Sequence, residues 1–434
     1  MIAILLNDAS FEQDIRELLM AFYPGETFTH KEEEAGEAEL IVRGVRDGNS
    51  FSLDVTPVKK EAVHFALIYP DFSNRFETKN EIKQTLYRLL SAQTGRELPW
   101  GTLTGIRPTK IALTKLYDGW TDEQIETYMR ETYFTIKEKI DLSIDVAERE
   151  RRLLSTIDYE NGYSLYVGIP FCPTTCLYCS FTSYPLVSWK NRVDAYLDAL
   201  EREIDYTAAK FYHKHLNSIY IGGGTPTTLE PYQLDRLIRK IKCSFDLSDC
   251  LEFTVEAGRP DSITREKLEV LRKWGISRIS INPQTMQQRT LDLIGRRHSV
   301  EQTVESFKIA RELGFDDINM DLIMGLPEES LEDVRDTLEQ IMQLKPDNLT
   351  VHSLALKRAA RLNMFKEDYK DYKMVNTQEH MDLTASYAKK MDLFPYYLYR
   401  QKGMAGNLEN VGYAKEGKAG VYNILIMEEK QTIV

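Results

Sequence analysis

The sequence predicts an α/β protein in which a small N-terminal α+β domain precedes a partial, open (β/α)6 TIM-like barrel. From residue 164 onward, six short apolar segments alternate with helical stretches, as in a parallel sheet whose strands are each covered by the helix that follows. These six units are fewer than the eight of a closed barrel. The preceding part mixes alternating strand patterns with helices, and 434 residues suffice for two or three domains.

The N-terminal α+β domain is expected over residues 1–98. Its apolar opening is followed by a helix from about residue 10 to 22, and then by two strands and a second helix in "AELIVRGV", "SFSLDVTPV" and "EIKQTLYRLLSA". Residues 99–160 are expected to form a helical linker segment. It starts with the Gly-, Thr- and Pro-rich loop "WGTLTGIRPTK" and continues with two amphipathic helices.

The barrel is expected over residues 161–375, with the strands "SLYVGI", "NSIYIG", "LEFTVEA", "SRISIN", "DINMDLI" and "NLTVHSL". Active sites of such barrels lie at the C-terminal ends of the strands. Each strand carries a chemically distinctive residue at or just beyond this end, in chain order Cys172, Gly222, Glu256, Gln284, Asp321 and His352. We therefore expect one shared cavity there. Residues 376–434 form a separate C-terminal segment.

Composition narrows the function classes. A hydrophobic share of 42% and a charged share of 28% are typical of a soluble globular protein. The net charge of −12 argues against a general nucleic-acid or membrane-surface binder. The apolar opening "MIAILL" is too short for a signal peptide or a spanning helix. We therefore expect a cytoplasmic protein with neither nucleic acid nor membrane as a partner.

Three of the five cysteines lie within eight residues in the spacing C-x3-C-x2-C, namely Cys172, Cys176 and Cys179. In a reducing compartment, such clustering predicts a metal or redox site rather than disulfides. Three soft thiolates suit an iron–sulfur cluster or a zinc ion. A structural zinc site requires four ligands, and no further Cys or His follows nearby, so the cluster is favoured and zinc is the alternative. The isolated Cys243 and Cys250 are expected to be buried structural residues.

The turn "GGGTPTTL" follows the second barrel strand. Its glycines are expected to let the backbone approach a ligand and to present N–H groups to a carboxylate. A simple strand-to-helix turn is the alternative. The turn lacks the Gly-Lys-Ser/Thr ending of a P-loop, which argues against a nucleoside-triphosphate site.

Five motifs occur in order along the barrel: "YVGIPFCPTTCLYCSF", "IGGGTPT", "VEAGRPD", "INPQT...LIGRRH" and "DLIMGLPEE". Together they resemble the radical S-adenosylmethionine (SAM) enzymes of the oxygen-independent coproporphyrinogen III oxidase group. The segments "WGTLTGIRPTK" and "PYYLYRQKGMAGNLENVGYA" resemble its HemZ-type coproporphyrinogen dehydrogenase branch. The resemblance covers nearly the whole chain and implies a radical SAM barrel.

The resemblance also implies a set of cofactor-binding residues. The three clustered cysteines would hold a [4Fe–4S] cluster whose open iron takes the amino and carboxylate groups of SAM. Tyr166 and the backbone at Tyr178 would flank that site. The other implied contacts are Gly224 and Thr225 at the methionine moiety, Glu256 and Gln284 at further polar groups, Arg296 at the carboxylate, Asp321 at a ribose hydroxyl and Ala355 beside the adenine. A network of salt bridges and hydrogen bonds at the barrel mouth is the alternative role for Glu256, Gln284, Arg296 and Asp321.

The implied reaction belongs to anaerobic haem synthesis. A 5′-deoxyadenosyl radical removes hydrogen from a propionate of coproporphyrinogen III, and loss of CO2 and an electron leaves a vinyl group; two rounds give protoporphyrinogen IX. The implied partners are a porphyrinogen or haem-type substrate and a reduced electron donor such as flavodoxin or ferredoxin. Cations are expected to bind the substrate carboxylates. The candidates are Arg107 and Lys110, which would make the N-terminal domain part of the pocket wall, and Lys357, Arg358 and Arg361.

Two features depart from the family pattern. The oxidase proper has a further cysteine two places after the third cluster ligand, where this chain has Phe181. Cys-x-Phe is also the pattern of the related haem-chaperone branch, so a haem-binding chaperone without decarboxylase activity is the alternative function, and a radical SAM enzyme for another substrate is a third. Family members also continue into a glycine-rich segment, so we expect this chain to be truncated at its C-terminus.

Overall fold

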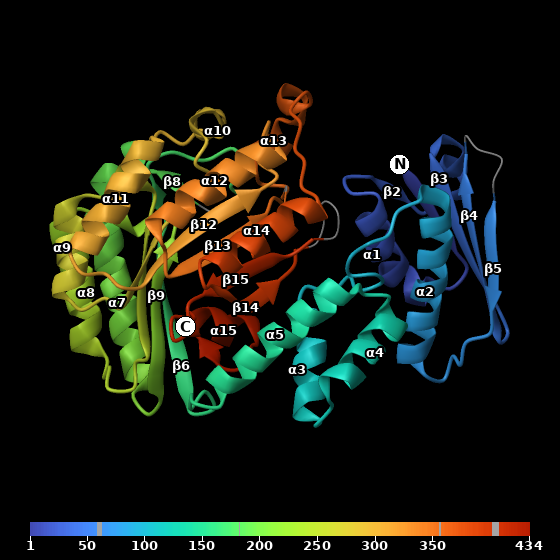
Figure 1. Ribbon diagram of the computed structural model, residues 1–434, viewed down its shortest axis with the longest axis horizontal. Helices are drawn as coiled ribbons and strands as arrows, with labels where there is room; N and C mark the ends of the chain where they lie inside the picture. Colours follow the sequence, from blue (N-terminus) through green and yellow to red (C-terminus); the bar gives the residue numbers. More distant parts are fainter. Residues whose placement is uncertain (59–62, 182, 356, 402–407) are drawn as a thin grey trace. The chain divides into compact units, whose positions relative to one another are not determined.

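The computed structural model describes residues 1–58, 63–181, 183–355, 357–401 and 408–434 (Figure 1). The chain forms two compact units: residues 1–144 with 400–409, and residues 145–399 with 410–434. This division differs from the four segments expected from the sequence. In particular, part of the C-terminal segment belongs to the first unit and the rest to the second.

The first unit contains a five-stranded sheet in the order β2-β1-β3-β4-β5. Its strands are β1 (Ile2–Leu6), β2 (Phe28–Thr29), β3 (Leu40–Asp47), β4 (Ser50–Pro57) and β5 (His64–Ile68). Burial alternates residue by residue along β4, as the sequence predicts for a sheet with one covered face. The helices α1 (Glu12–Phe22) and α2 (Arg75–Thr94) pack on the covered face, in a core that includes Phe22 and Phe51. The small α+β domain is therefore present.

The remainder of the first unit consists of α3 (Thr109–Tyr117), α4 (Asp122–Tyr133) and the start of α5 (Lys137–Leu154). A buried ion pair joins Lys139 Nζ to Glu409 Oε1, and the Trp100 indole N–H donates to the other carboxylate oxygen at 2.8 Å. The guanidinium of Arg400 donates to the Leu103 carbonyl at 2.7 Å. Arg400 and Glu409 thus bind the loop that the sequence places at 100–110, while residues 402–407 lie outside the described residues.

The second unit contains a nine-stranded sheet in the order β14-β15-β13-β12-β11-β10-β9-β6-β16. Six consecutive parallel strands form its centre, which confirms the predicted (β/α)6 arrangement. They are β6 (Gly162–Ile169), β9 (His215–Gly223), β10 (Glu252–Gly258), β11 (Arg278–Ile281), β12 (Ile318–Met324) and β13 (Asn348–Ser353). Among the residues that the structure describes, the strand order ends at β14 and β16 and does not return to its start, so the barrel is open.

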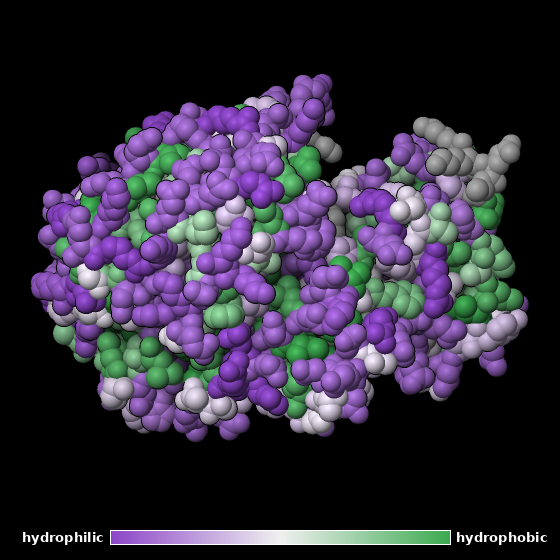
Figure 2. All heavy atoms as spheres, viewed as in Figure 1, coloured by the Kyte–Doolittle hydropathy of each residue, from purple (hydrophilic) through white to green (hydrophobic). Residues whose placement is uncertain are grey.

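Helices follow each parallel strand and cover the sheet (Figure 1). The main ones are α7 (Val193–Phe211), α8 (Pro231–Ser244), α9 (Arg265–Lys273), α10 (Gln288–Leu293), α11 (Val300–Glu312), α12 (Leu331–Leu344) and α14 (Gln378–Lys390). Along α8, Leu234, Leu237, Ile238 and Ile241 are buried at helical spacing. Hydrophilic residues accordingly cover much of the helical face seen in Figure 2. Within the described residues, no helix combines the length and apolar character needed to cross a membrane.

The C-terminal segment completes the barrel sheet instead of standing apart from it. Strands β14 (Phe394–Tyr399) and β15 (Asn410–Ala414) add an antiparallel pair beside β13, and β16 (Thr432–Ile433) pairs with β6 in parallel. Helix α15 (Val421–Met427) packs Ile424 and Leu425 against Tyr396 and Tyr397 of β14. The sequence pattern did not predict these strands.

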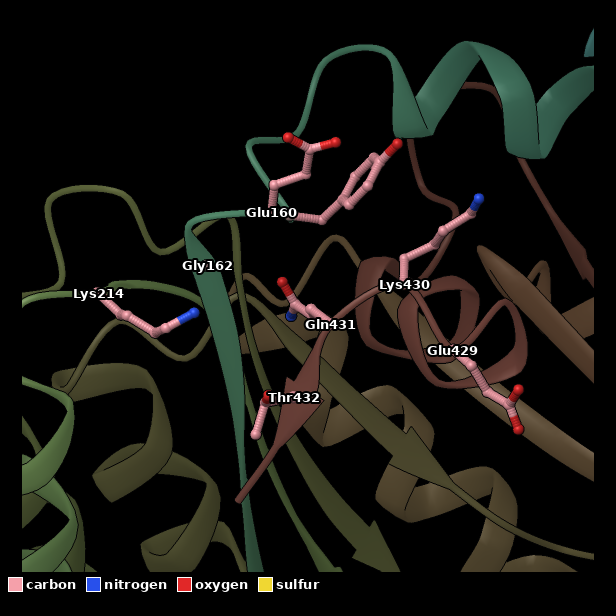
Figure 3. Close-up of a pocket in the computed structure, with 8 residues that line it drawn as sticks. Glu160, Gly162, Lys214, Glu429, Lys430, Gln431 and Thr432 are labelled. Carbon is pink, nitrogen blue, oxygen red and sulfur yellow. The ribbon is translucent and has the colours of Figure 1, made fainter.

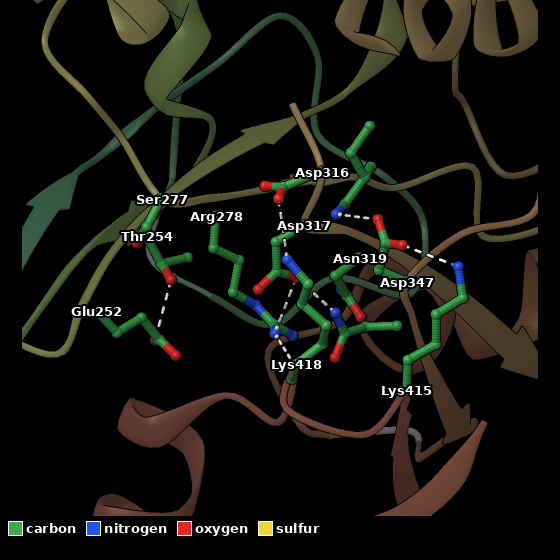
Figure 4. Close-up of polar contacts among 12 residues, drawn as sticks. Glu252, Thr254, Ser277, Arg278, Asp316, Asp317, Asn319, Asp347, Lys415 and Lys418 are labelled. Atoms are coloured by element: carbon green, nitrogen blue, oxygen red, sulfur yellow. Dashed lines mark hydrogen bonds and ion pairs between the residues drawn. The ribbon is translucent and has the colours of Figure 1, made fainter. Parts of the chain in front are cut away.

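A polar network ties the barrel strands to the C-terminal segment (Figure 4). Arg278 donates to Asp317 Oδ1 at 3.4 Å and to the Lys418 carbonyl at 2.8 Å. Asp347 pairs with Lys415 at 2.9 Å. Buried charges need such partners, so these contacts fix how the C-terminal segment meets the strands.

Candidate functional site

The cysteine loop follows β6. Cys172 ends the short strand β7 (Phe171–Cys172), which pairs with β8 (Tyr184–Pro185), and Cys176 and Cys179 lie on the loop between these strands. All three thiols are free; Cys172 and Cys176 are buried and Cys179 is half-buried. Burial raises the pKa of the Cys172 and Cys179 thiols, and each sulfur is also close enough to Cys176 for like charges to raise it further. The loop therefore carries two buried thiols and one half-buried thiol beyond the end of β6.

In the described part of the chain, no three His, Cys, Asp or Glu side chains converge tightly enough to hold a metal ion. A cubane cluster differs from a single ion because each cysteine binds a different iron atom, which sets the sulfurs farther apart. The loop thus offers no compact ion site formed by the three cysteines. Of the isolated cysteines, Cys250 is half-buried, but Cys243 is exposed and so is not the buried residue expected from the sequence.

Each sulfur has a hydrogen-bonding neighbour from the chain. Thr225 Oγ1 lies 3.6 Å from Cys172 Sγ, and the hydroxyl of Ser183 also interacts with this thiol. Arg259 Nη1 donates to Cys176 Sγ at 3.7 Å. The Phe181 backbone hydrogen-bonds Cys179. Donors around a sulfur favour the thiolate, which is the form that binds iron.

The loop is anchored to the ends of several barrel strands. Thr174 Oγ1 donates to the Gly295 carbonyl at 2.9 Å, and the Leu177 N–H donates to the Ile294 carbonyl at 3.0 Å. On the side of β13, the Leu362 N–H donates to the Leu177 carbonyl at 3.0 Å. The loops after β9, β10, β11 and β13 therefore meet at the cysteines, as the strand-end argument predicts.

The glycine turn after β9 lies directly against the cysteine loop. A Cβ atom at Gly224 would stand 2.6 Å from the Phe171 carbonyl oxygen and 3.0 Å from Cys172 Sγ, so only glycine fits without displacement. The close approach seen here is therefore one between the turn and the cysteine loop. The N–H groups of Gly224 and Thr225, however, donate to the Ile169 and Phe171 carbonyls, each at 2.8 Å, and so do not face a carboxylate as expected.

Glu256 lies two residues before the end of β10, close to several tyrosine rings. The Tyr220 hydroxyl donates to Glu256 Oε1 at 2.6 Å. Burial raises the pKa of Glu256 to about 7. The Tyr220 ring stacks on Tyr166 and Tyr422, with centroids 6.1 and 4.5 Å away. Tyr166 keeps 40% of its surface exposed, in keeping with a position beside a ligand. Tyr220 was not singled out by the sequence because a tyrosine within an apolar strand resembles a core residue.

Gln284 and Arg296 carry buried polar atoms that find no partner among the described residues. These atoms are Gln284 Oε1 and Arg296 Nε. Gln284 also has a positive φ of 72°, an uncommon backbone state that tends to occur at functional sites. The rest of the Arg296 guanidinium donates to the Asn282 carbonyl at 2.6 Å and to the Tyr178 hydroxyl at 3.2 Å. The predicted pair thus leaves unused hydrogen-bonding capacity in a buried place.

Asp321 lies within a chain of polar groups on β12 and its neighbours. Asn319 Nδ2 donates to Asp321 Oδ1 at 2.7 Å, and His352 Nε2 lies 3.9 Å from Oδ2. Burial alone would raise the pKa of Asp321, but the hydrogen bonds and the His352 ring hold it below the usual value. The other ring nitrogen of His352 meets the Tyr399 hydroxyl at 3.3 Å. No role was expected for His352 from the sequence, and the structure places it beside a predicted site residue.

An apolar wall adjoins these polar groups. Ile294, Ile323 and Leu326 are buried together, and Tyr178 and Leu354 pack against them. Ala355, the expected adenine neighbour, follows Leu354 directly and is partly exposed. Of the expected substrate cations, Lys357, Arg358 and Arg361 are exposed beyond β13, whereas half-buried Arg107 and exposed Lys110 belong to the first unit.

A pocket of about 320 Å³ lies elsewhere, at the start of β6 (Figure 3). Its walls include Gly162 and Lys214 from the strand starts and Gln431 and Thr432 from the C-terminus. None of the residues that line it is a predicted site residue. It occupies the opposite end of β6 from the cysteine loop.

The radical SAM superfamily model matches residues 166–341. The oxygen-independent coproporphyrinogen-III oxidase-like protein HemZ of Bacillus subtilis is 41% identical over 87% of this chain and 77% of its own length. The haem chaperone HemW of the same organism is 42% identical over 44% of this chain, and the oxygen-independent coproporphyrinogen III oxidase of Escherichia coli is 33% identical over 52%. The chain spans about half the length of these two relatives, 50% and 48%.

Among solved structures, that of the coproporphyrinogen III oxidase HemN of Escherichia coli, described as a radical SAM enzyme, is similar. Its TM-score is 0.50 at 28% identity, over 64% of this chain and 61% of the other. Radical SAM proteins use a [4Fe–4S] cluster and SAM. The match to the HemZ protein extends along most of both chains and includes the barrel with its cysteine loop. The chain therefore belongs to the radical SAM superfamily and, within it, to the family of HemZ-like oxygen-independent coproporphyrinogen-III oxidase-like proteins.

Proposed function

We propose that this protein catalyses the oxygen-independent oxidative decarboxylation of coproporphyrinogen III to protoporphyrinogen IX. The observation that carries the proposal is the 41% identity to a HemZ oxidase-like protein over 87% of the chain, which includes much of the first unit as well as the barrel. The haem chaperones match only 44% of the chain. The proposed setting is the cytoplasm, where thiols stay reduced.

The residues at the barrel mouth fit the cofactors that the family uses. Cys172, Cys176 and Cys179 would bind three irons, and no fourth cysteine of the loop competes for the last one. The partnerless polar atoms of Gln284 and Arg296 suit a ligand with carboxylate and hydroxyl groups, as SAM has. When bound, the reduced cluster and SAM supply one-electron cleavage of a carbon–sulfur bond and hence hydrogen abstraction from the substrate.

The protein's own groups would bind and orient SAM. Arg296 is proposed to pair with the SAM carboxylate, and Asp321, which its neighbours keep ionised, with a ribose hydroxyl. Glu256 would accept a hydrogen bond from a polar group of the cofactor. Gly224, Thr225, Tyr166, Ala355 and the backbone at Tyr178 would complete the contacts. The buried setting strengthens each polar contact because little water screens it.

The substrate carries propionate carboxylates that need cations. Lys357, Arg358 and Arg361 lie just beyond β13, and Arg361 begins the short helix α13 (Arg361–Met364), whose Leu362 N–H binds the cysteine loop. These three cations of the second unit are the proposed carboxylate contacts. Hydrogen-atom loss from the propionate, followed by departure of CO2 and transfer of one electron to a one-electron acceptor, would leave a vinyl group. A flavodoxin or ferredoxin is the proposed electron donor.

A haem-binding chaperone is the second candidate. The observation that favours it is Phe181, which is 73% exposed and directly adjoins the cluster loop where the oxidase group has a cysteine. An exposed aromatic ring at this place suits contact with a flat apolar tetrapyrrole.

The two functions are separated by anaerobic reconstitution with iron and sulfide, followed by incubation with a reductant, SAM and coproporphyrinogen III. Decarboxylation predicts protoporphyrinogen IX together with 5′-deoxyadenosine. Stoichiometric haem binding with no porphyrinogen turnover would refute the enzyme proposal and support the chaperone. Cys172→Ala serves as the control without cluster.

A further inference from the structure

Arg259 is a buried cation that lies beside the cysteine loop, and the sequence motifs gave it no role. It follows β10 and keeps only 3% of its surface exposed. Its backbone is held by the turn η5 (Pro260–Ser262), in which the Ser262 N–H and hydroxyl donate to the Arg259 carbonyl at 2.9 and 2.8 Å. The side chain therefore starts from a rigid point of the barrel mouth.

The guanidinium makes contacts in three directions. Its Nη1 donates to the Thr174 carbonyl at 2.9 Å, to Thr174 Oγ1 at 2.8 Å and to Cys176 Sγ at 3.7 Å. Its Nε and Nη2 form a two-pronged pair with Asp261 at 3.0 and 2.7 Å. Such a pair fixes the plane of a guanidinium. Asp261 therefore aims Nη1 at the cysteine loop.

Arg259 differs in charge from the other groups that hydrogen-bond the cysteine sulfurs. Thr225, Ser183 and the backbone of Phe181 are neutral, whereas the guanidinium is cationic. Reduction adds negative charge to a cluster and its thiolates, and a buried donor, above all a charged one, stabilises that charge. Groups outside the ligand shell tune metal centres in this way.

We propose that Arg259 is a positioning residue for the cluster, which fixes the loop through Thr174 and raises the reduction potential of the cluster through its hydrogen bond to Cys176. This inference rests on the proposed function in so far as the three cysteines hold a [4Fe–4S] cluster. Asp261 has two effects in it, because it orients the guanidinium and also offsets part of its charge.

The test is a redox titration of the reconstituted cluster without SAM, in which electron paramagnetic resonance monitors the reduced cluster and gives its midpoint potential. Arg259→Gln is expected to lower the midpoint potential by at least about 59 mV, which corresponds to a tenfold change in the equilibrium constant of a one-electron reduction. Arg259→Lys, which keeps the charge, should fall between this variant and wild type. Asp261→Asn removes the counter-charge but keeps one side-chain oxygen that can accept from the guanidinium, so the cation stays near Cys176 and the potential should shift upward. Exposed Arg297 supplies the control Arg297→Gln, whose potential should equal that of wild type.

Loosened packing lowers iron content and thermal stability, but it does not determine whether the midpoint potential rises or falls. Opposite shifts of the potential in the Arg259 and Asp261 variants would therefore not arise from loosened packing. A loaded Arg259→Gln with the wild-type potential overturns the inference. If this variant loads no iron, Asp261→Asn decides: an upward shift supports the proposal and any other result overturns it. A wild-type chain that assembles no [4Fe–4S] cluster refutes the proposed function itself.

Discussion

Gly224→Ala tests the close approach of the glycine turn to the cysteine loop. The added Cβ would lie 2.6 Å from the Phe171 carbonyl oxygen and 3.0 Å from Cys172 Sγ, both well inside normal contact distances. The carbonyl cannot retreat freely because it accepts the Thr225 N–H at 2.8 Å. The substitution must therefore push β7, and with it Cys172, away from the turn.

Overpacking of this kind costs about 1–3 kcal/mol. At about 2–4 °C per kcal/mol for a domain of this class, the barrel should unfold at least about 2 °C lower. The matched control is Gly36→Ala, where a Cβ would meet no atom within 4 Å. Alanine at such a position restricts the unfolded chain, so stability there should hold or rise slightly.

The assay combines thermal unfolding of the apoprotein with iron per chain after anaerobic reconstitution. Gly224→Ala should unfold earlier and load less iron, because the displaced Cys172 no longer matches the other two ligands. If the Gly224 and Gly36 variants show the same melting temperature and iron content, the argument from the glycine contact is wrong.

Three further predictions concern the same site. Replacing Cys172, Cys176 or Cys179 by Ala should abolish iron loading and the brown absorbance, and a wild-type protein that takes up stoichiometric zinc but no iron would contradict the cluster assignment. Arg296→Gln should weaken SAM binding by about ten- to a hundredfold, since a charged hydrogen bond is worth about 1.5–3 kcal/mol; unchanged affinity in calorimetry would remove Arg296 from the pocket. Because the pKa of Glu256 rises from 4.5 to about 7 on folding, its contribution to stability is complete below 4.5 and is lost as the pH rises through about 7. The stability of wild type relative to Glu256→Gln should therefore fall between pH 4.5 and 7, and a constant difference across that range would refute the shift.

The order of the barrel is readable in the sequence because each parallel strand is buried on both faces. Such strands are short continuous apolar runs, and the helices between them show one apolar stripe, as α8 does at Leu234, Leu237, Ile238 and Ile241. The spacing of the three cysteines is equally local. The cysteine loop follows the first barrel strand. Because the C-terminal ends of all parallel strands lie at one end of a barrel, the topology alone predicts that the later strand ends meet this loop.

The C-terminal strands could not be predicted in the same way. β16 has only two residues, and β15 pairs with β13 across more than fifty residues of intervening chain. Short strands carry too little periodicity to distinguish them from loops, and their partners are chosen by the free edges of the completed sheet. Tertiary contact therefore decided that residues 410–434 belong to the barrel.

The sequence by itself determined which chemistry the chain can offer, namely three thiolates and a series of polar residues at successive strand ends. Only the tertiary structure decided which groups touch them. Arg259 reaches Cys176 from eighty-three positions away, and Tyr220 reaches Glu256 across neighbouring strands. No local pattern encodes these pairs, because burial and distance are set by how the strands and loops pack, and a buried charge finds its partner only in the folded barrel.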